Sequence, residues 1–173
     1  MALVALALPI ACTLDPQDSR EVVVRSANPQ TASRVAPSFT INVAGGVHLI
    51  EVERCAGTCT AYARAGLHFF EPSSERDEVE TVWTTGVGTG PLDSHDGRPN
   101  IQGAVTYGVT PGGAGFATTP AQLETGATYA VNAYRFEPCE DESDDCYHQA
   151  AIGGGFFVYR PGASLTLNVS SLR

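Results

Sequence analysis

The chain has 173 residues, with 19 acidic side chains against 10 basic ones and a formal net charge of −9 at pH 7. A surface with this charge repels phosphate backbones, so we do not expect nucleic acid as a partner. Hydrophobic residues make up 43% of the chain, which excludes wholesale disorder. The length suits one folded domain with a modest extension.

Residues 1–12 form an apolar, uncharged run that ends in a small residue and Cys12. Such a run is too short to span a bilayer, which takes about 20 residues, but it suits the hydrophobic region of a secretory signal. It resembles the end of a bacterial lipoprotein signal, in which Cys12 carries the lipid and becomes the mature N-terminus. It departs from that pattern in lacking a basic residue and in placing Pro9 where Leu is usual. The alternatives are an ordinary signal cut near Ala7 or Ala11, or a buried N-terminal strand.

This resemblance implies an outer-membrane lipoprotein that faces the periplasm or the cell surface, with the lipid bilayer as a partner through its N-terminal lipid. Residues 13–37 are polar and include Pro16, Pro29 and Pro37. They are predicted to form a flexible tether with one candidate edge strand. Residues 38–173 are predicted to form the folded domain.

From Ser38 onward, short alternating apolar segments are separated by Gly, Pro, Asp and Asn. Residues 39–43 and 48–52 alternate on either side of Gly45-Gly46, which predicts a β-hairpin. Residues 61–70 fit a strand or a short helix equally well. Further strands are predicted at residues 79–84, 103–109, 128–136, 155–160 and 165–169. The pattern predicts an all-β, antiparallel sandwich.

The four cysteines that follow Cys12 are an even number at short spacings, which is typical of disulfides in an exported chain. Of three connectivities, the local pairing Cys55–Cys59 with Cys139–Cys146 is favoured, because short loops close at small entropic cost. A four-thiolate zinc site is disfavoured by the six residues between Cys139 and Cys146. A redox-active pair is disfavoured by the three residues between Cys55 and Cys59.

Residues 123–133, Leu-Glu-Thr-Gly-Ala-Thr-Tyr-Ala-Val-Asn-Ala, resemble the E–F corner and F strand of fibronectin type III domains. The resemblance implies that the Tyr129 hydroxyl returns to the backbone a few residues upstream. It also implies that Gly126 permits the tight turn and that Leu123 fills the core below it. The alternative is an ordinary turn that leads into a strand.

Two upstream segments extend the resemblance to roughly residues 75–160. Residues 79–83, which end in the single tryptophan, Trp83, look like strand B, and residues 101–109 look like strand C. The resemblance therefore implies an immunoglobulin- or fibronectin III-like β-sandwich with additional N-terminal strands in residues 38–70. Because this scaffold hosts many unrelated roles, it does not predict a function.

Residues 137–146 carry six acidic side chains and no basic one. Carboxylates at this density are able to bind Ca²⁺, with Glu140, Asp141, Glu142, Asp144 and Asp145 as candidate ligands. Their spacing departs from that of an EF-hand loop, and most such runs are solvated loop tips. We therefore expect no cofactor, with Ca²⁺ as the alternative.

Residues 91–100 contain Asp93, His95 and Asp96, which could hold a divalent metal in a hydrolase. Neighbouring residues of a strand point to opposite faces, and Asp-Gly and Pro-Asn are loop signals, so a structural role is favoured. His48 falls in the strand alternation and is predicted to be a partly buried strand residue. The chain shows no zinc-binding histidine spacing, no nucleophile elbow and no assignable glycosidase carboxylate pair. We expect no enzymatic activity.

Aromatic side chains are able to form a recognition platform if two or three share an exposed face, although in a small sandwich most lie in the core. The candidates are Tyr62, Phe69, Phe70, Tyr107, Tyr134 and Tyr159. We therefore expect a non-enzymatic, membrane-anchored binding or scaffolding module whose partner is an envelope protein or a glycan. The alternatives are a calcium- or carbohydrate-binding module and, less favoured, a metal-dependent hydrolase.

Overall fold

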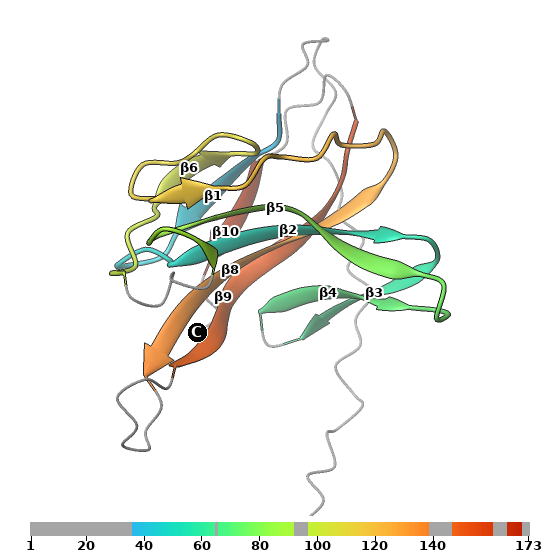
Figure 1. Cartoon of the computed structure of the whole chain (residues 1–173), viewed down its shortest axis with the longest axis horizontal. Helices are drawn as coiled ribbons and strands as arrows, with labels where there is room; N and C mark the ends of the chain where they lie inside the picture. Colours follow the sequence, from blue (N-terminus) through green and yellow to red (C-terminus); the bar gives the residue numbers. More distant parts are fainter. Residues whose placement is uncertain (1–35, 65, 92–96, 139–146, 161–165, 171–173) are drawn as a thin grey trace, which may run out of the picture.

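A computed structural model describes residues 36–64, 66–91, 97–138, 147–160 and 166–170. The regular elements in these residues are ten β-strands in three sheets (Figure 1). The predicted all-β class is therefore confirmed, and most strand pairings are antiparallel. A search of the same residues for a helix able to cross a membrane found none. The predicted leader with Cys12, and the predicted tether up to residue 35, lie outside them.

The largest sheet has five strands, all paired antiparallel. In β2, Ile50 and Val52 are fully buried on one face, whereas Glu51 and Glu53, which alternate with them, are half-buried on the other. The alternation read from the sequence therefore places one face of β2 against the core. The strands lie in the order β7 (Phe116–Ala117), β5 (Glu78–Gly86), β2 (Leu49–Ala56), β8 (Thr128–Pro138) and β9 (Tyr147–Val158).

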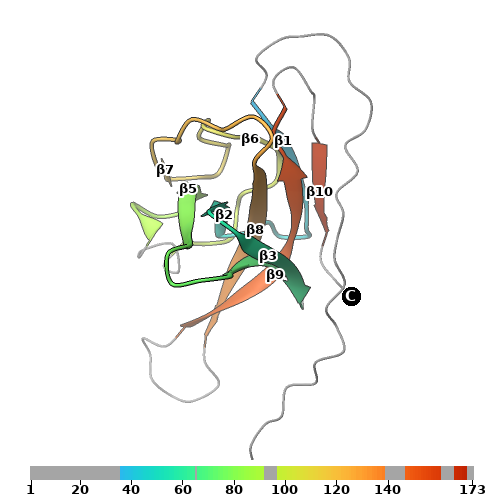
Figure 2. The same ribbon diagram turned by 90° about the vertical axis from the view of Figure 1, so that its right-hand side faces the viewer.

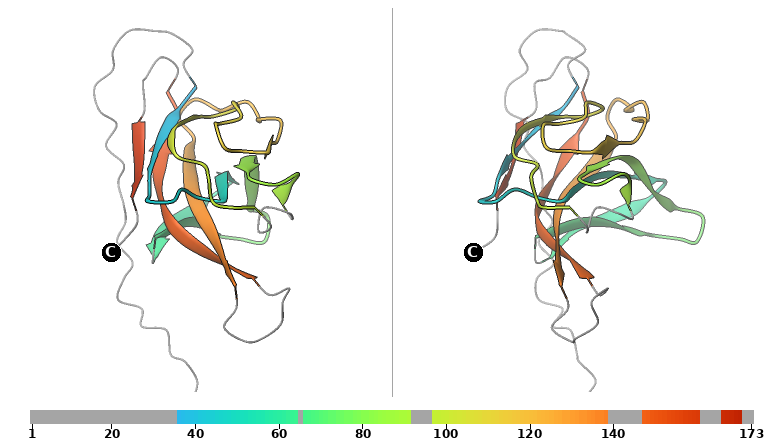
Figure 3. Two further views of the ribbon diagram at one scale, coloured as in Figure 1. Left: turned by 90° about the vertical axis from the view of Figure 1, so that its left-hand side faces the viewer. Right: turned by 60° about the vertical axis from the view of Figure 1, so that its left-hand side comes forward.

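A three-stranded sheet packs on the inner face of the larger one. It consists of β10 (Thr166–Ser170), β1 (Ser38–Asn42) and β6 (Gly103–Thr106), with β1 in the middle, antiparallel to β6 and parallel to β10. Figure 2 shows β10 at the outer side of β1, and Figure 3 shows β1 crossing over the long β8–β9 pair. Phe39 of β1 is fully buried with its ring 5.7 Å from that of Phe157, so the main core lies between these two sheets.

A two-stranded ribbon, β3 (Cys59–Arg64) and β4 (Leu67–Pro72), covers part of the other face of the large sheet. Figure 1 shows it on the opposite side of β2 and β5 from β1 and β6. Phe70 packs on Phe156, with ring centroids 5.4 Å apart. The side chain of Asn132 donates to the carbonyl of His68 at 2.7 Å and accepts from the His68 N–H at 2.8 Å. The ribbon is thus attached by an apolar contact and by the Asn132 side chain, which bonds the N–H and the carbonyl of His68 as a neighbouring strand would.

The helical alternative for residues 61–70 is therefore wrong. Tyr62 pairs with Phe69 across the two strands, and Gly66 at the turn has φ 84°, a conformation that glycine adopts without strain. Alanine and aromatic residues at this spacing fit a helix stripe and a hairpin equally well, and the glycine decides between them.

The predicted hairpin of residues 39–43 with 48–52 is also wrong. Gly45 and Gly46 do turn the chain, with φ values of 79° and 74°, but β1 and β2 belong to different sheets. The apolar faces of β1 and β2 meet across the core, whereas two paired strands of one sheet present their side chains to a common face. Residues 43–48 therefore carry the chain from one sheet to the other.

His48 lies in that connection, just before β2, and is only 5% exposed. Its Nδ1 accepts a hydrogen bond from the Phe136 N–H at 3.0 Å, which leaves Nε2 to donate to the Gly97 carbonyl at 3.0 Å. Burial lowers the pKa of His48, which favours this neutral tautomer. His48 is therefore buried, as its alternation predicted, but it joins three segments of backbone instead of belonging to a strand.

The corner before β8 has the contact that the fibronectin III resemblance implied. The Tyr129 hydroxyl accepts a hydrogen bond from the backbone N–H of Glu124 at 2.8 Å. Gly126 has φ 86°, and Leu123 is partly buried against the main core. Trp83 is fully buried in that core, 5.4 Å from the ring of Tyr107.

Two strand assignments drawn from the resemblance are wrong. In an immunoglobulin-type sandwich, strands C and F share a sheet and strand B lies in the opposite one. Residues 79–83, assigned to strand B, belong to β5 and share a sheet with β8. Residues 101–109, assigned to strand C, contain β6, which lies in the other sheet. Local alternation marks the buried face of a strand and carries no information about the sheet that it joins.

The remaining predicted strands are present as β5, β6, β8, β9 and β10. The start of β9 is the largest error, because the strand begins at Tyr147 and not at Gly155. Three consecutive glycines, residues 153–155, indicate a turn or a bulge where backbones approach closely, and they continue the strand beside a bulge at Ile152. At Gly154 the backbones approach so closely that an added Cβ would lie 2.4 Å from the carbonyl oxygen of Val131.

We therefore expect Gly154→Ala to lower the free energy of unfolding by about 1–3 kcal/mol, the usual cost of overpacking. The added methyl group would collide with Val131 and with the Asn132 side chain, 2.7 Å away. Urea unfolding would measure the loss. Gly112→Ala is the matched control, because a Cβ there has nothing within 4 Å. Equal midpoints for the two variants would contradict this explanation of the glycine.

The predicted local disulfide between Cys55 and Cys59 is present, with the Cα atoms 6.1 Å apart. It joins the end of β2 to the start of β3, where the ribbon leaves the large sheet. Cys139 and Cys146 lie outside the described residues. The Cys55–Cys59 disulfide therefore lies where the chain passes from the large sheet to the β3–β4 ribbon.

Candidate ligand groove

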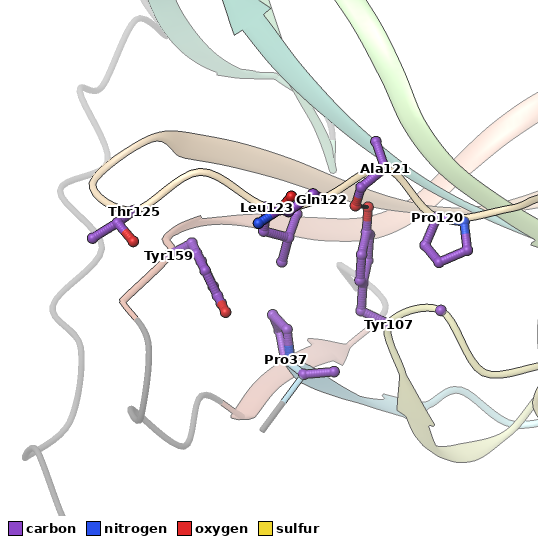
Figure 4. Close-up of a pocket in the computed structure, with 10 residues that line it drawn as sticks. Pro37, Tyr107, Pro120, Ala121, Gln122, Leu123, Thr125 and Tyr159 are labelled. Atoms are coloured by element: carbon purple, nitrogen blue, oxygen red, sulfur yellow. Dashed lines mark hydrogen bonds between the residues drawn. The ribbon is translucent and has the colours of Figure 1, made fainter. Parts of the chain in front are cut away.

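A groove of about 690 Å³ opens at one end of the strands, between the two sheets that enclose the core (Figure 4). Its walls come from four segments that are distant in sequence: the residues just before β1, just after β6, in the approach to β8, and just after β9. The lining residues are Ala36, Pro37, Tyr107, Gly108, Pro120, Ala121, Gln122, Leu123, Thr125 and Tyr159.

Tyr107 forms one wall and is held firmly. Its hydroxyl donates to the carbonyl of Ala121 at 2.8 Å and approaches that of Val82 at 3.1 Å, and its backbone N–H donates to the carbonyl of Pro37 at 2.8 Å. Burial raises the pKa of Tyr107 to about 12, so the hydroxyl keeps its proton at physiological pH. Tyr107 is only 6% exposed and its ring packs on Trp83, so it supports the groove wall and offers little surface of its own.

Tyr159 forms the opposite wall. Its N–H donates to the carbonyl of Ala127 at 3.0 Å, and its carbonyl accepts from the N–H of Gly126 at 2.8 Å. Figure 4 shows the two tyrosine rings facing each other across the groove, with Leu123 and Pro37 between them. The backbone that carries each ring is therefore fixed by hydrogen bonds to a neighbouring segment.

The approach to β8, residues 120–125, is anchored on three sides. Besides the contact of Ala121 with Tyr107, the Ala121 N–H donates to the carbonyl of Val82 at 3.0 Å. Glu124 donates its N–H to Tyr129, and its carboxylate pairs with Arg54 of β2. The groove wall is thus tied to β5, to β8 and to β2, and its shape is set by the fold.

The chemistry of the groove is that of a binding surface. The ten lining residues include no His, Cys, Asp, Glu or Arg, and Gln122 and Thr125 are exposed at the rim. Prolines, tyrosine rings and Leu123 provide apolar contact, and a few polar groups give orientation, as is usual for ligand sites. The groove itself therefore supplies contact area and hydrogen bonds, without an acid–base pair.

A second hollow of about 560 Å³ lies on the other side of residues 123–128. It is lined by the Cys55–Cys59 disulfide together with Arg54, Glu124 and Phe70. The Arg54 guanidinium already pairs with Glu80 at 2.9 Å and with Glu124, and these carboxylates raise the pKa of Arg54. Because two negative charges surround the one positive charge, this hollow does not favour an anion.

Titratable groups also gather on the outer face of β2, a grouping that the sequence analysis did not single out. Burial raises the pKa of Glu51 and of Glu53, and the charge of Glu51 raises that of Glu53 further. The hydroxyl of Tyr134 is hydrogen-bonded to Glu51, which opposes part of the rise. The Glu-Val-Glu alternation in β2 was the feature of the sequence that could have indicated this grouping of carboxylates. It places both carboxylates on one face without revealing that the face is half-covered.

These raised pKa values predict a pH dependence of stability. A carboxyl whose pKa is higher in the folded state than in the unfolded state stabilises the fold below its unfolded pKa, and this contribution is lost as the pH rises through the folded pKa. Glu51→Gln should therefore raise the urea midpoint at about pH 7 and leave it almost unchanged at about pH 3.5. Glu71→Gln, on the exposed end of β4, controls for the loss of charge. An equal shift at both pH values would refute the assignment to burial.

Of the aromatic residues predicted to form a platform, Tyr159 is half-buried at the groove, and Tyr62 stacks on Phe69 along the ribbon with centroids 5.7 Å apart. Tyr107 lines the same groove but is buried. Phe70 and Tyr134 are buried. The sequence did not indicate that Pro37 and Pro120 line the same groove, because the residues around each proline do not show which distant segment it will lie near.

The candidate ligands of the two metal sites that the sequence analysis disfavoured lie outside the described residues. Asp93, His95 and Asp96 belong to residues 92–96, and the acidic candidates from Glu140 to Asp145 belong to residues 139–146. Among the residues that the structure does describe, no three His, Cys, Asp or Glu side chains are placed to hold a metal ion. In comparisons with known proteins, no family model matches this chain, and no curated protein and no solved structure is detectably similar to it.

Proposed function

We propose that this chain is a non-enzymatic binding module of the bacterial cell envelope, held at the outer membrane by a lipid on Cys12 and presenting the groove to an extended segment of an envelope partner. The observation that carries the proposal is a groove whose walls are already fixed by hydrogen bonds, with the half-buried ring of Tyr159 on one side and the buried Tyr107 holding the other. An accessible tyrosine ring such as that of Tyr159 offers contact area at low entropic cost, and preformed walls leave little ordering to be done on binding.

The proposal includes a fibronectin III- or immunoglobulin-like sandwich with revised strand places. In it, β8 and β9 take the places of strands F and G, β2 and β5 those of C and C′, and β1 and β6 those of B and E. Support comes from the order β5-β2-β8-β9 in one sheet, from the antiparallel β1–β6 pair in the other, and from the Tyr129 contact at the entry to β8. The groove then lies where the E–F connection passes the end of strand G.

The membrane anchor is tested by fractionating cells that express the full chain. The proposal expects the protein in the outer-membrane fraction, with a diacylglyceryl group on Cys12 detected by mass spectrometry. Cys12→Ala should move the protein to the soluble fraction. An unmodified N-terminus located beyond Cys12 would remove the lipoprotein part of the proposal and leave the groove unaffected.

The groove is tested by placing a photo-crosslinking amino acid at Gln122, which is exposed at its rim, and at Thr60, which is exposed on the ribbon. In living cells, the probe at position 122 should give a defined adduct, identified by mass spectrometry, and the probe at position 60 should not. Tyr159→Ala should abolish the adduct while leaving the protein level unchanged. An adduct that persists in this variant would show that the contact does not use the groove.

A further inference from the structure

We infer that His48 is a pH-sensitive switch, which holds the outer end of the β8–β9 hairpin against residues 43–48 while its ring is neutral and releases it when the ring gains a proton. This outer end consists of residues 135–138 of β8 and 147–150 of β9. The inference is carried by the hydrogen bonds of the His48 ring and by the extent of the strand pairing beside it. It does not depend on the groove, which lies at the other end of β8 and β9.

The outer end of the hairpin reaches past the strand that pairs with the rest of β8. The pairing of β8 with β2 stops at Tyr134, which lies opposite Leu49, the first residue of β2. Figure 1 shows this end of β8 and β9 projecting beyond the neighbouring strands. Two side chains join it to residues 43–48. One is His48, and the other is Arg135, whose guanidinium donates to the backbone carbonyls of residue 46, at 2.8 Å, and of residue 44.

Both ring nitrogens of His48 are engaged with backbone groups. Nδ1 accepts a hydrogen bond from the Phe136 N–H at 3.0 Å, and Nε2 lies 3.0 Å from the Gly97 carbonyl oxygen, to which it is able only to donate. The neutral ring with its proton on Nε2 satisfies both contacts. In the charged ring both nitrogens carry protons, so the Phe136 N–H faces a second N–H. Protonation therefore removes the hydrogen bond that holds β8 at this point.

The surroundings of the ring disfavour its charged form. Burial lowers the pKa of His48, the positive charge of Arg135 lowers it further, and the hydrogen bond to Gly97 opposes part of this fall. Once charged, the ring and the Arg135 guanidinium repel each other at the same junction. Arg135 therefore does not replace the contact that the ring loses.

The other ionisable side chains on the neighbouring elements are engaged elsewhere or exposed. Glu51 of β2 is hydrogen-bonded to Tyr134, and Glu137 of β8 is exposed, as is Arg98 of the segment that contains Gly97. Residues 43–47 and 86–91 contain no ionisable side chain. In the described part of the chain, no carboxylate is hydrogen-bonded to the His48 ring.

The sign of the pH effect follows from linkage. A histidine whose pKa is lower in the closed state than in the open state favours opening as the pH falls below its ordinary value of about 6.5. The opening that frees the ring then becomes easier by up to about tenfold for each pH unit, until the ring is protonated in the closed state as well. The inner part of β8 stays paired with β2 and β9, so opening is confined to the outer end.

Hydrogen exchange of the full chain in detergent, followed by NMR, tests the inference. Protection of the Phe136 amide, corrected for the intrinsic exchange rate, should fall by about tenfold between about pH 7 and about pH 5. Protection of Val131 and Ile50, in the inner part of the sheet, should stay the same. Equal protection of Phe136 at both pH values would overturn the inference, and so would a fall shared by all three amides.

His48→Asn tests the ring itself. Its side-chain oxygen is an acceptor near the place of Nδ1 and does not titrate in this range, so protection of Phe136 should no longer depend on pH. His68→Asn is the matched control, because His68 is a half-buried histidine of the ribbon whose pKa is also lowered by burial. This variant should keep the pH dependence of the parent chain. A dependence that survives in His48→Asn would assign the switch to another group.

The parent chain provides a reading that needs no variant. The nitrogen chemical shifts of His48 should show an unprotonated Nδ1 at about pH 7 and a protonated one at lower pH. The midpoint of this change should coincide with the loss of Phe136 protection. A ring that titrates without any change at Phe136 would contradict the switch and leave the proposed function unaffected.

Discussion

Replacing Asn132 with Ala should lower the free energy of unfolding by about 2–4 kcal/mol and release the β3–β4 ribbon from the sheet. The Asn132 side chain is fully buried and satisfies both the N–H and the carbonyl of His68. Its truncation leaves two backbone groups without these partners, and each such group costs about 1–3 kcal/mol where water cannot reach it. The ribbon has no hydrogen-bonded strand pairing to the large sheet that could compensate.

Hydrogen exchange distinguishes this release from global destabilisation. Amides of β3 and β4 should lose protection in Asn132→Ala under native conditions, while those of β2 and β8 keep theirs. Thr60→Ala, exposed on the outer side of the ribbon, should leave exchange and urea midpoint unchanged. Uniform loss of protection throughout the domain would show that Asn132 stabilises the whole domain and does not specifically attach the β3–β4 ribbon.

Phe157→Ala should be the most damaging of the core substitutions considered, with an expected loss of about 3–5 kcal/mol. The ring is fully buried, stacks on Tyr129 at 5.2 Å and lies 5.7 Å from Phe39 of the opposing sheet. Its removal opens a cavity at the point where β1, β8 and β9 meet, and it deprives Tyr129 of the packing that orients its hydroxyl toward Glu124. Loss of this contact would also disturb the groove wall.

Urea unfolding monitored by circular dichroism would measure the effect of Phe157→Ala. Val109→Ala is the comparison, because Val109 is 55% exposed and a change there should stay within about 0.5 kcal/mol. A loss below about 1 kcal/mol for Phe157→Ala would mean that the two sheets do not depend on this ring for their contact.

The elements that could be predicted are those encoded by neighbouring residues. The Tyr129 corner needs only Leu123, Gly126 and the tyrosine within a few positions, and the structure has this contact. The Cys55–Cys59 pairing follows from a short loop in the same way. The alternation of β2 likewise indicates its buried face without reference to the rest of the chain.

The elements that could not be predicted depend on distant partners. The sequence of β1 and β2 predicts a hairpin, because the alternation and the Gly-Gly turn are both local features. The two strands nevertheless belong to different sheets, because Phe39 and Ile50 pack in the same core from opposite sides. The groove is the extreme case. Pro37, Tyr107 and Tyr159 come together only after both sheets have formed, and no spacing in the chain encodes their meeting.

The anchoring of residues 120–125 divides the rim into positions with different freedom to vary. Ala121 and Glu124 hold the wall to β5 and β8 through backbone groups, and the Glu124 carboxylate adds a pairing with Arg54 of β2 that its replacement would remove. Gln122 and Thr125 each follow one of these residues, line the groove and have exposed side chains. Selection for a new partner, natural or in the laboratory, would therefore find its most tolerant sites at Gln122 and Thr125, where a new side chain leaves these anchoring contacts in place.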